Sequence, residues 1–104
     1  MPIPATKYIW FNGKLVLWEN ATVHVLSHAI HYGSSVFEGV RAYQTPSGPA
    51  IFRLTDHTRR LFESAKIYRI PMPFTPEQIN VACREIIAVN GLARGAYLRP
   101  LAMR

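Results

Sequence analysis

The chain has little cysteine and no long apolar run. Its one cysteine, Cys83, has no partner for an internal disulfide, so a cytoplasmic setting is expected. No stretch of apolar residues is long enough to cross a bilayer. The segment Met1–Lys7 lacks the apolar core of a signal peptide. We therefore expect a protein that does not associate with a membrane.

Acidic residues are also scarce. The net charge is +6, from 12 Lys and Arg against 6 Asp and Glu, which favours anionic partners such as nucleic acid or small molecules that carry phosphate or carboxylate. Asp56 and Glu63 interrupt the densest basic patch, and for most of that patch a solvated helix face is the simpler interpretation. The patch consists of Arg53, His57, Arg59, Arg60, Lys66 and Arg69.

A small basic domain with aromatic residues raises single-stranded nucleic acid as an alternative partner. The carboxylates inside the basic patch, and the lack of Lys or Arg between the aromatic residues of the expected strands, argue against nucleic-acid binding. A module for dimerisation without catalysis is a further alternative. If the chain binds nucleic acid, its affinity for nucleic acid should weaken steeply as the salt concentration rises.

At 104 residues and 49% hydrophobic content, the chain is expected to form one globular domain with a modest core. The predicted order is strand, strand, short helix, strand, strand, helix, helix, strand. This order indicates an α+β fold with a mainly antiparallel sheet. The segment 22–26 is short and is expected to be extended.

Residues 8–18 carry a strong hairpin signal. Asn12 and Gly13 stand between apolar runs and favour a two-residue turn in which both residues have positive φ. That turn places Trp10 opposite Leu15. Both faces of the hairpin are largely apolar, so we expect the hairpin to be covered on both sides, with its aromatic residues in the core.

Two longer helices are expected. Thr55 is predicted to cap the first, which runs to about Arg69, and Thr75 caps the second in a capping box with Gln78. Gly91 is expected just past the end of the second helix. The predicted core-facing residues are Leu61, Phe62, Ala65 and Tyr68 in the first helix and Ile79, Ala82, Cys83, Ile86 and Ile87 in the second.

Three histidines lie at or just before the start of the central stretch of the chain. His24, His28 and His31 are spaced by four and three residues, which suits one face of a short helix capped by Ser27 and ended by Gly33. Zinc is possible in principle, but no cysteine or carboxylate in the segment completes a ligand set. Structural, hydrogen-bonding histidines are the favoured interpretation.

The stretch from His28 to Tyr43 organises the chain. From Val36 onward its residues alternate with period two, which predicts a strand, and Phe37, Gly39, Arg41 and Tyr43 share one face. A glycine inside a strand marks close approach by a ligand or by another backbone. An aromatic ring, a bare backbone and a cation in a row suit a small molecule with an apolar part and an anionic part. Taken singly, each residue also fits an ordinary core or surface role.

The segment His31-Tyr-Gly-Ser-Ser-Val-Phe-Glu-Gly-Val-Arg41 closely resembles the N-terminal signature of branched-chain amino-acid aminotransferases. These are fold-type IV, or class IV, enzymes that use pyridoxal phosphate. The resemblance extends from Tyr8-Ile-Trp-Phe-Asn-Gly13 through Ser64-Ala-Lys-Ile-Tyr-Arg69 to Tyr97-Leu-Arg-Pro100. The Gly-Ser-Ser and Phe-Glu-Gly-Val-Arg elements favour the branched-chain group over the D-amino-acid aminotransferases and aminodeoxychorismate lyases.

The resemblance implies a role for seven residues. Arg60 would bind the cofactor phosphate, and Tyr32 and Phe37 would line the side-chain pocket. Tyr97 would help bind the α-carboxylate, and Arg99 would meet the distal carboxylate of glutamate. The implied substrate-binding set is Tyr32, Phe37, Gly39, Arg41, Tyr97 and Arg99. Some of these residues are expected to serve the active site of a partner subunit in a dimer-based homo-oligomer.

The resemblance also implies what other parts of the enzyme supply. The lysine that forms the Schiff base and the glutamate that pairs with the ring nitrogen belong to a C-terminal domain, beyond Arg104. Residues 1–104 are thus expected to be the N-terminal domain and to be inactive alone. The whole enzyme would transfer the amino group of leucine, isoleucine or valine to 2-oxoglutarate, in branched-chain amino-acid biosynthesis.

Overall fold

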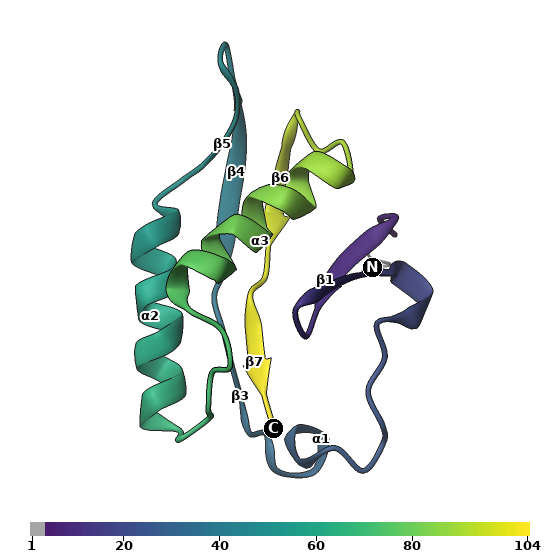
Figure 1. Cartoon of the computed structure of the whole chain (residues 1–104), viewed down its shortest axis with the longest axis vertical. Coiled ribbons are helices and arrows are strands. Elements are labelled where there is room, and N and C mark those ends of the chain that lie inside the picture. Colours follow the sequence, from purple (N-terminus) through teal and green to yellow (C-terminus); the bar gives the residue numbers. More distant parts are fainter. Residues whose placement is uncertain (1–3) are drawn as a thin grey trace.

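The computed structural model describes residues 4–104, so the first three residues of the segment tested for a signal peptide lie outside it. The fold is α+β, and every strand pair is antiparallel, as predicted (Figure 1). Among residues 4–104, no helix combines the length and the apolar character that crossing a membrane requires. The elements are β1 (Tyr8–Phe11), β2 (Lys14–Leu17), a 3-10 helix (Trp18–Asn20), α1 (His28–Tyr32), β3 (Ser35–Phe37), β4 (Val40–Thr45), β5 (Gly48–Ile51), α2 (Leu54–Ile67), α3 (Pro76–Val89), β6 (Gly95–Leu98) and β7 (Leu101–Met103).

A long antiparallel ladder runs along the vertical axis of the molecule in Figure 1. It pairs β3 with β7 and β4 with β6, and the register continues from one pair to the next. Between the two pairs, Glu38 therefore lies opposite Pro100, and Gly39 lies opposite Arg99. The alternation from Val36 onward predicted an unbroken strand. This strand and its partner are both divided because Pro100 has no N–H to extend the ladder, although its carbonyl accepts the N–H of Glu38 at 3.0 Å.

The two faces of the ladder differ as the alternation predicts. Val36, Glu38, Val40 and Ala42 are buried, at 0–6% exposed. The other parity faces outward, where Phe37 is 52% exposed. The ladder therefore has one face for the core and one face that is open along its length.

The core consists of two clusters on the buried face of the ladder. Helix α3 covers β4 and β6, where Val40 and Leu98 pack with Ile79 and Ile87. Helix α2 covers β3, where Val36 packs with Leu61, Ala65 and Ile70. Glu38 lies between Val36 and Val40 and thus at the junction of the two clusters.

Helix α3 follows the sequence prediction closely. Thr75 and Gln78 form the expected capping box, with the Thr75 hydroxyl accepting the N–H of Gln78 at 3.2 Å. Gly91 has a φ of 63° just past the helix end. Cys83 is 8% exposed, and its burial raises the pKa of the thiol, consistent with a small core residue.

Helix α2 differs from the prediction at both ends. It begins at Leu54, and Thr55 is not its cap; Arg53 precedes it in the left-handed conformation, with a φ of 52°. Burial of Leu54 in the core outweighs the capping preference of Thr55. Tyr68 was expected in the core but is 63% exposed, because the helix ends at Ile67 and Tyr68 follows at its cap.

The β1–β2 hairpin has the predicted register, with Trp10 opposite Leu15, and Asn12 and Gly13 both have positive φ. Its expected burial on both sides is wrong, since every strand residue is at least partly exposed. One side packs on α3, where the rings of Trp10 and Phe74 meet edge-on at 5.1 Å. The side chain of Asn90 stabilises this contact, because it accepts a hydrogen bond from the N–H of Tyr8 and donates one to the C=O of Tyr8.

One connecting segment also departs from expectation. Residues 22–26 contain no strand, although α1 follows and ends just before Gly33 as predicted, with a Gly33 φ of 66°. The connection between β4 and β5 is a two-residue turn, because Thr45 pairs with Gly48 at the start of β5. Gly48 supplies the positive φ, at 107°, that this tight connection requires.

Glu38 is the one charged residue that is buried among residues 4–104, at 4% exposed. Its carboxylate accepts hydrogen bonds from Arg60 and His57 on α2. The hydrogen bond from Arg60 is the main cause that lowers the pKa of Glu38, against the opposing effect of burial. The charge is therefore kept in the core by two side chains of one helix.

We predict that the chain loses stability in acid through Glu38. Because the folded-state pKa lies below the ordinary value of 4.5, this contribution is complete above that value and disappears as the pH falls through the folded-state pKa. Glu38→Gln should lower the free energy of unfolding by about 1–3 kcal/mol at neutral pH and by much less in acid. Urea unfolding at about pH 7 and about pH 3 measures both effects.

The matched control is Glu85→Gln, at an exposed position of α3. This substitution should change the free energy of unfolding by less than about 0.5 kcal/mol at either pH. A Glu38→Gln penalty of the same size in acid as at neutral pH would show that the pairing does not depend on the carboxylate charge.

Candidate functional site

Five of the six predicted substrate-binding residues lie on the open face of the ladder. Residues in register across an antiparallel pair share a face, so Gly39 lies beside Arg99, and Arg41 lies beside Tyr97. Phe37 belongs to the same face, at the end of β3. The predicted grouping of these five residues is thus present in the fold.

Arg99 is the centre of this group. Its guanidinium lies 4.3 Å from the centroid of the Phe37 ring, and its Nη2 donates to the Tyr97 hydroxyl at 3.0 Å. The guanidinium of Arg41 lies 5.6 Å from the Tyr97 ring. Two cations and a phenol hydroxyl can together hold a carboxylate, while the Phe37 ring offers an apolar contact.

Gly39 makes this arrangement possible. A Cβ atom at this position would overlap the Tyr97 hydroxyl, so a larger residue would displace the phenol from its place above the strand. The sequence predicted that a ligand or another backbone approaches closely at Gly39. The structure identifies the approaching group as the Tyr97 side chain.

Arg60 is fixed by Glu38. Its Nη2 donates to Oε1 of Glu38 at 2.7 Å and its Nε donates to Oε2 at 2.9 Å, a two-point pairing that sets the plane of the guanidinium. This pairing raises the pKa of Arg60. The side chain is 65% exposed, and Nη1 takes no part in the pairing, so its N–H groups can donate to an anion.

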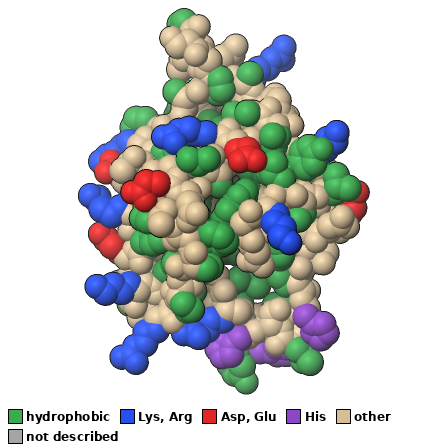
Figure 2. All heavy atoms as spheres, viewed as in Figure 1, with side chains coloured by type: hydrophobic (Ala, Val, Ile, Leu, Met, Phe, Trp, Pro, Cys, Tyr) green, Lys and Arg blue, Asp and Glu red, His purple; other side chains and the backbone are tan. Residues whose placement is uncertain are grey.

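Arg59 is in a different position from its neighbour Arg60. It pairs with Asp56 at 3.7 Å and with Glu63 at 3.8 Å along the exposed side of α2. Basic and acidic side chains alternate along the edge of the molecule that α2 occupies (Figure 2). The basic patch is therefore partly neutralised within the helix itself.

Sequence reasoning missed Glu38 and His57 as parts of the site. The Nδ1 atom of His57 lies 2.8 Å from Oε1 of Glu38, and both carboxylate oxygens are engaged. The sequence pattern places the Glu38 carboxylate at a buried position of the strand, and a buried carboxylate requires hydrogen-bonding or charged partners. His57 and Arg60, three residues apart, were candidates because such residues share a helical face.

The predicted site residues do not form one cluster. Glu38 has the buried parity of the ladder, so Arg60 reaches it from the α2 side, whereas the five substrate residues have the outward parity. Tyr32 lies apart on α1, is 75% exposed and stacks on His28 with ring centroids 4.5 Å apart. The structure thus places the seven residues in three groups.

The three histidines at positions 24, 28 and 31 make hydrogen bonds, as predicted. His28 pairs with the Ser34 hydroxyl at 2.6 Å, and His31 pairs with the carbonyl of Val25 at 2.8 Å. His24 accepts the N–H of Leu26. Figure 2 shows histidine side chains at the lower end of the molecule, and in the described part of the chain no group of three potential ligands is placed to bind a metal ion.

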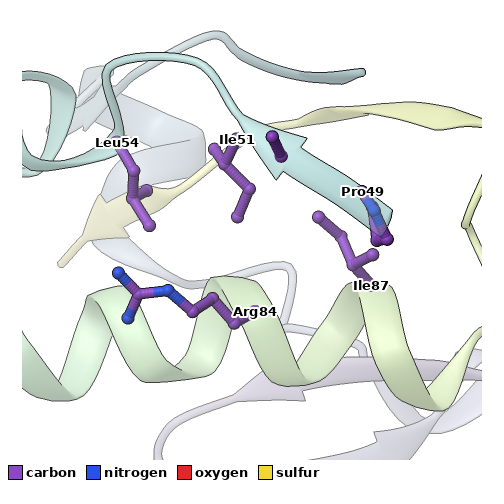
Figure 3. A pocket seen from close by; sticks show the side chains of 6 residues that line it. Pro49, Ile51, Leu54, Arg84 and Ile87 are labelled. Carbon is purple, nitrogen blue, oxygen red and sulfur yellow. The ribbon is translucent and has the colours of Figure 1, made fainter. Parts of the chain in front are cut away.

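Two hollows in the surface contain no predicted site residue. One, of about 290 Å³, lies between β5 and α3 with the Arg84 side chain along its wall (Figure 3). The other, of about 690 Å³, lies mainly between α2 and α3. The candidate site is therefore an open face with a neighbouring arginine rather than an enclosed cavity.

Comparisons with known proteins agree with this fold. The family model Amino-transferase class IV matches residues 35–104. The branched-chain-amino-acid aminotransferase of Escherichia coli (strain K12) is 54% identical over 94 residues, which are 90% of this chain and 30% of that protein. The enzyme of the same name from Pseudomonas aeruginosa is 54% identical over 93 residues, which are 89% of this chain and 30% of that protein.

Solved structures give the same result. The branched-chain amino acid aminotransferase from Escherichia coli superposes with a TM-score of 0.90 at 51% identity, over 94% of this chain and 33% of that chain. The enzyme from T.th., in complex with N-(5'-phosphopyridoxyl)-L-glutamate, superposes with a TM-score of 0.91 at 52% identity, over 94% and 33%. The same enzyme has also been solved with 4-methylvaleric acid.

The chain spans about 30% of the length of the curated relatives it matches. Its fold matches the N-terminal domain of branched-chain aminotransferase structures, as the sequence predicted. The family model covers two-thirds of the chain, including the ladder, both long helices and the Phe37–Arg99 face. The chain belongs to the class IV aminotransferase family.

Proposed function

We propose that the protein containing this chain is a branched-chain amino-acid aminotransferase that uses pyridoxal phosphate and passes the amino group of leucine, isoleucine or valine to 2-oxoglutarate. The observation that carries the proposal is the face on which Arg99 lies against Phe37 and bonds to Tyr97. A cation beside an aromatic ring suits a pocket that must accept both an acidic and an apolar side chain. The two complexes of the T.th. relative, one with a glutamate conjugate and one with a branched acid, support the same pair of substrates.

The donor set of Arg60 suits the cofactor phosphate. Glu38 fixes the plane of the guanidinium and leaves Nη1 for an anion, which suits a phosphate dianion better than a mobile surface arginine would. When bound, pyridoxal phosphate supplies the electron-withdrawing ring and carries the amino group between the two substrates. The phosphopyridoxyl group of the T.th. complex supports this choice of cofactor.

The outward face would bind the amino and oxo acids. The Tyr97 hydroxyl would donate to the α-carboxylate, with Arg41 as the nearby cation, and Arg99 would pair with the distal carboxylate of glutamate or 2-oxoglutarate. Phe37 would contact the apolar part of a branched side chain. A carboxylate buried against such a surface requires a cation, because an unpaired buried charge is costly.

The rest of the catalytic centre is assigned to other parts of the protein. We propose that the lysine that binds the cofactor covalently, and the glutamate that pairs with its ring nitrogen, lie in a C-terminal domain outside these 104 residues. The relatives are about three times as long as this chain, which leaves room for such a domain. Within this chain, the residues bind and orient substrate and phosphate.

We also propose that the protein is a homo-oligomer in which Tyr32 serves a neighbouring subunit. Tyr32 is 75% exposed, and three apolar residues of the same segment are at least half exposed. These three are Val25, Leu26 and Ile30. An exposed apolar segment next to a predicted pocket residue is consistent with burial against another part of the assembly.

Arg60→Ala should weaken retention of pyridoxal phosphate by about tenfold or more in the full-length protein, because the phosphate loses a charge-assisted partner. Arg59→Ala, at the adjacent position that pairs with Asp56 and Glu63, is the matched control and should have little effect. Cofactor titration followed by absorbance measures both variants. Equal losses in the two variants would make the assignment of Arg60 wrong.

Arg99→Ala should damage the half-reactions of glutamate and 2-oxoglutarate more than that of leucine. The expected difference is about 2 kcal/mol, or about thirtyfold in kcat/KM, as for a truncated charge pair in a buried pocket. Single half-reactions of the full-length enzyme, followed separately for each substrate, provide the measurement.

The control for Arg99 is Arg94→Ala, an exposed arginine before β6. It should leave both half-reactions unchanged. If Arg99→Ala reduces the leucine and glutamate half-reactions equally, Arg99 is structural, and Arg41 becomes the candidate for the distal carboxylate.

A further inference from the structure

His57 contacts the carboxylate that holds Arg60. Its Nδ1 atom lies 2.8 Å from Oε1 of Glu38, the same oxygen that accepts Nη2 of Arg60 at 2.7 Å. The His57 side chain is 23% exposed, whereas that of Arg60 is 65% exposed. Glu38 therefore has an inner partner and an outer partner, both on α2.

We propose that His57 is a positioning residue for phosphate recognition, which acts through Glu38 to hold the Arg60 guanidinium in the orientation that a phosphate requires. The inference rests on the proposed function of Arg60. It extends that function to a residue that does not touch the phosphate.

The geometry of the carboxylate gives the first reason. The terminal torsion of a glutamate side chain is broad, so the carboxylate plane turns easily unless a second, separate side chain also holds it. The bond from His57 fixes Oε1, and in this plane Oε1 and Oε2 together face Nη2 and Nε of Arg60. Without His57, the carboxylate plane would be set by Arg60 alone, and the two side chains would move together.

The charge balance gives the second reason. A carboxylate beside Arg60 offsets its positive charge, so Glu38 cannot help phosphate binding through net charge. Its contribution must come from order: a guanidinium held in place before the anion arrives loses less freedom on binding. A second donor on Glu38 increases that order, because it holds the carboxylate from a side that Arg60 does not occupy.

The test compares two ligands and two substitutions in the full-length protein. The ligands are pyridoxal phosphate and pyridoxal, which lacks the phosphate. His57→Leu removes the donor, whereas His57→Asn can place an amide nitrogen near the position of Nδ1 and keep a bond to Glu38. The measured quantity is the Kd of each ligand, determined by absorbance titration.

His57→Leu should weaken the binding of pyridoxal phosphate about tenfold, the lower end of the range found when a residue that orients a metal ligand is removed. Pyridoxal should bind with unchanged affinity, and His57→Asn should restore most of the affinity for pyridoxal phosphate. Unchanged pyridoxal binding serves as the internal control for folding, because a purely structural defect would weaken both ligands.

Each other outcome has a separate meaning. If His57→Leu weakens both ligands equally, or neither, the positioning role is wrong. If His57→Asn is as defective as His57→Leu, the hydrogen bond is not the cause and the proposal is also wrong. The Arg60→Ala variant distinguishes a failure of the His57 proposal from a failure of the proposed function. If Arg60→Ala leaves the preference for pyridoxal phosphate over pyridoxal unchanged, the assignment of Arg60 to the phosphate is wrong.

Discussion

A buried carboxylate sets the relation between the ladder and α2. Glu38 lies between Val36 and Val40 on the face that forms the core, at the junction of the two apolar clusters. A charge in such a place is tolerated only with partners of good geometry. The described residues supply them from one helix, through Arg60 and His57. The apolar contacts of α2 bring it to the sheet, and the ion pair selects the rotation in which these two side chains meet the strand.

The interruption of the ladder gives two functions to adjacent residues. Glu38 and Gly39 follow each other in sequence but belong to opposite faces, and Pro100 and Arg99 stand opposite them. The inner residue anchors an arginine, and the outer residue leaves space for a phenol. Arg60, which we propose binds the phosphate, and the face that we propose binds the substrate are thus both supported by two adjacent residues between β3 and β4, with the core packed behind them.

Sequence patterns predicted the parts of the fold that depend on nearby residues. The turn at Asn12 and Gly13, the capping box at Thr75 and the alternation around Phe37 are all local, and all three are present. Three predictions were wrong because packing against distant residues decides the outcome. They are the cap of α2 at Thr55, the burial of Tyr68 and the burial of the hairpin on both sides. The role of Glu38 depends on partners 19 and 22 residues away, which alternation alone cannot identify. The grouping of Phe37 with Arg99 was found through resemblance to a family, and the register of the strands supplies its physical basis.

The glycine beneath the Tyr97 hydroxyl limits how this face can evolve. Every other amino acid would add at least one carbon where the phenol lies, so a substitution at Gly39 would require the Tyr97 side chain to move. Divergent members of the family that replace the glycine would be expected to change the tyrosine as well, so that the two positions vary as a linked pair.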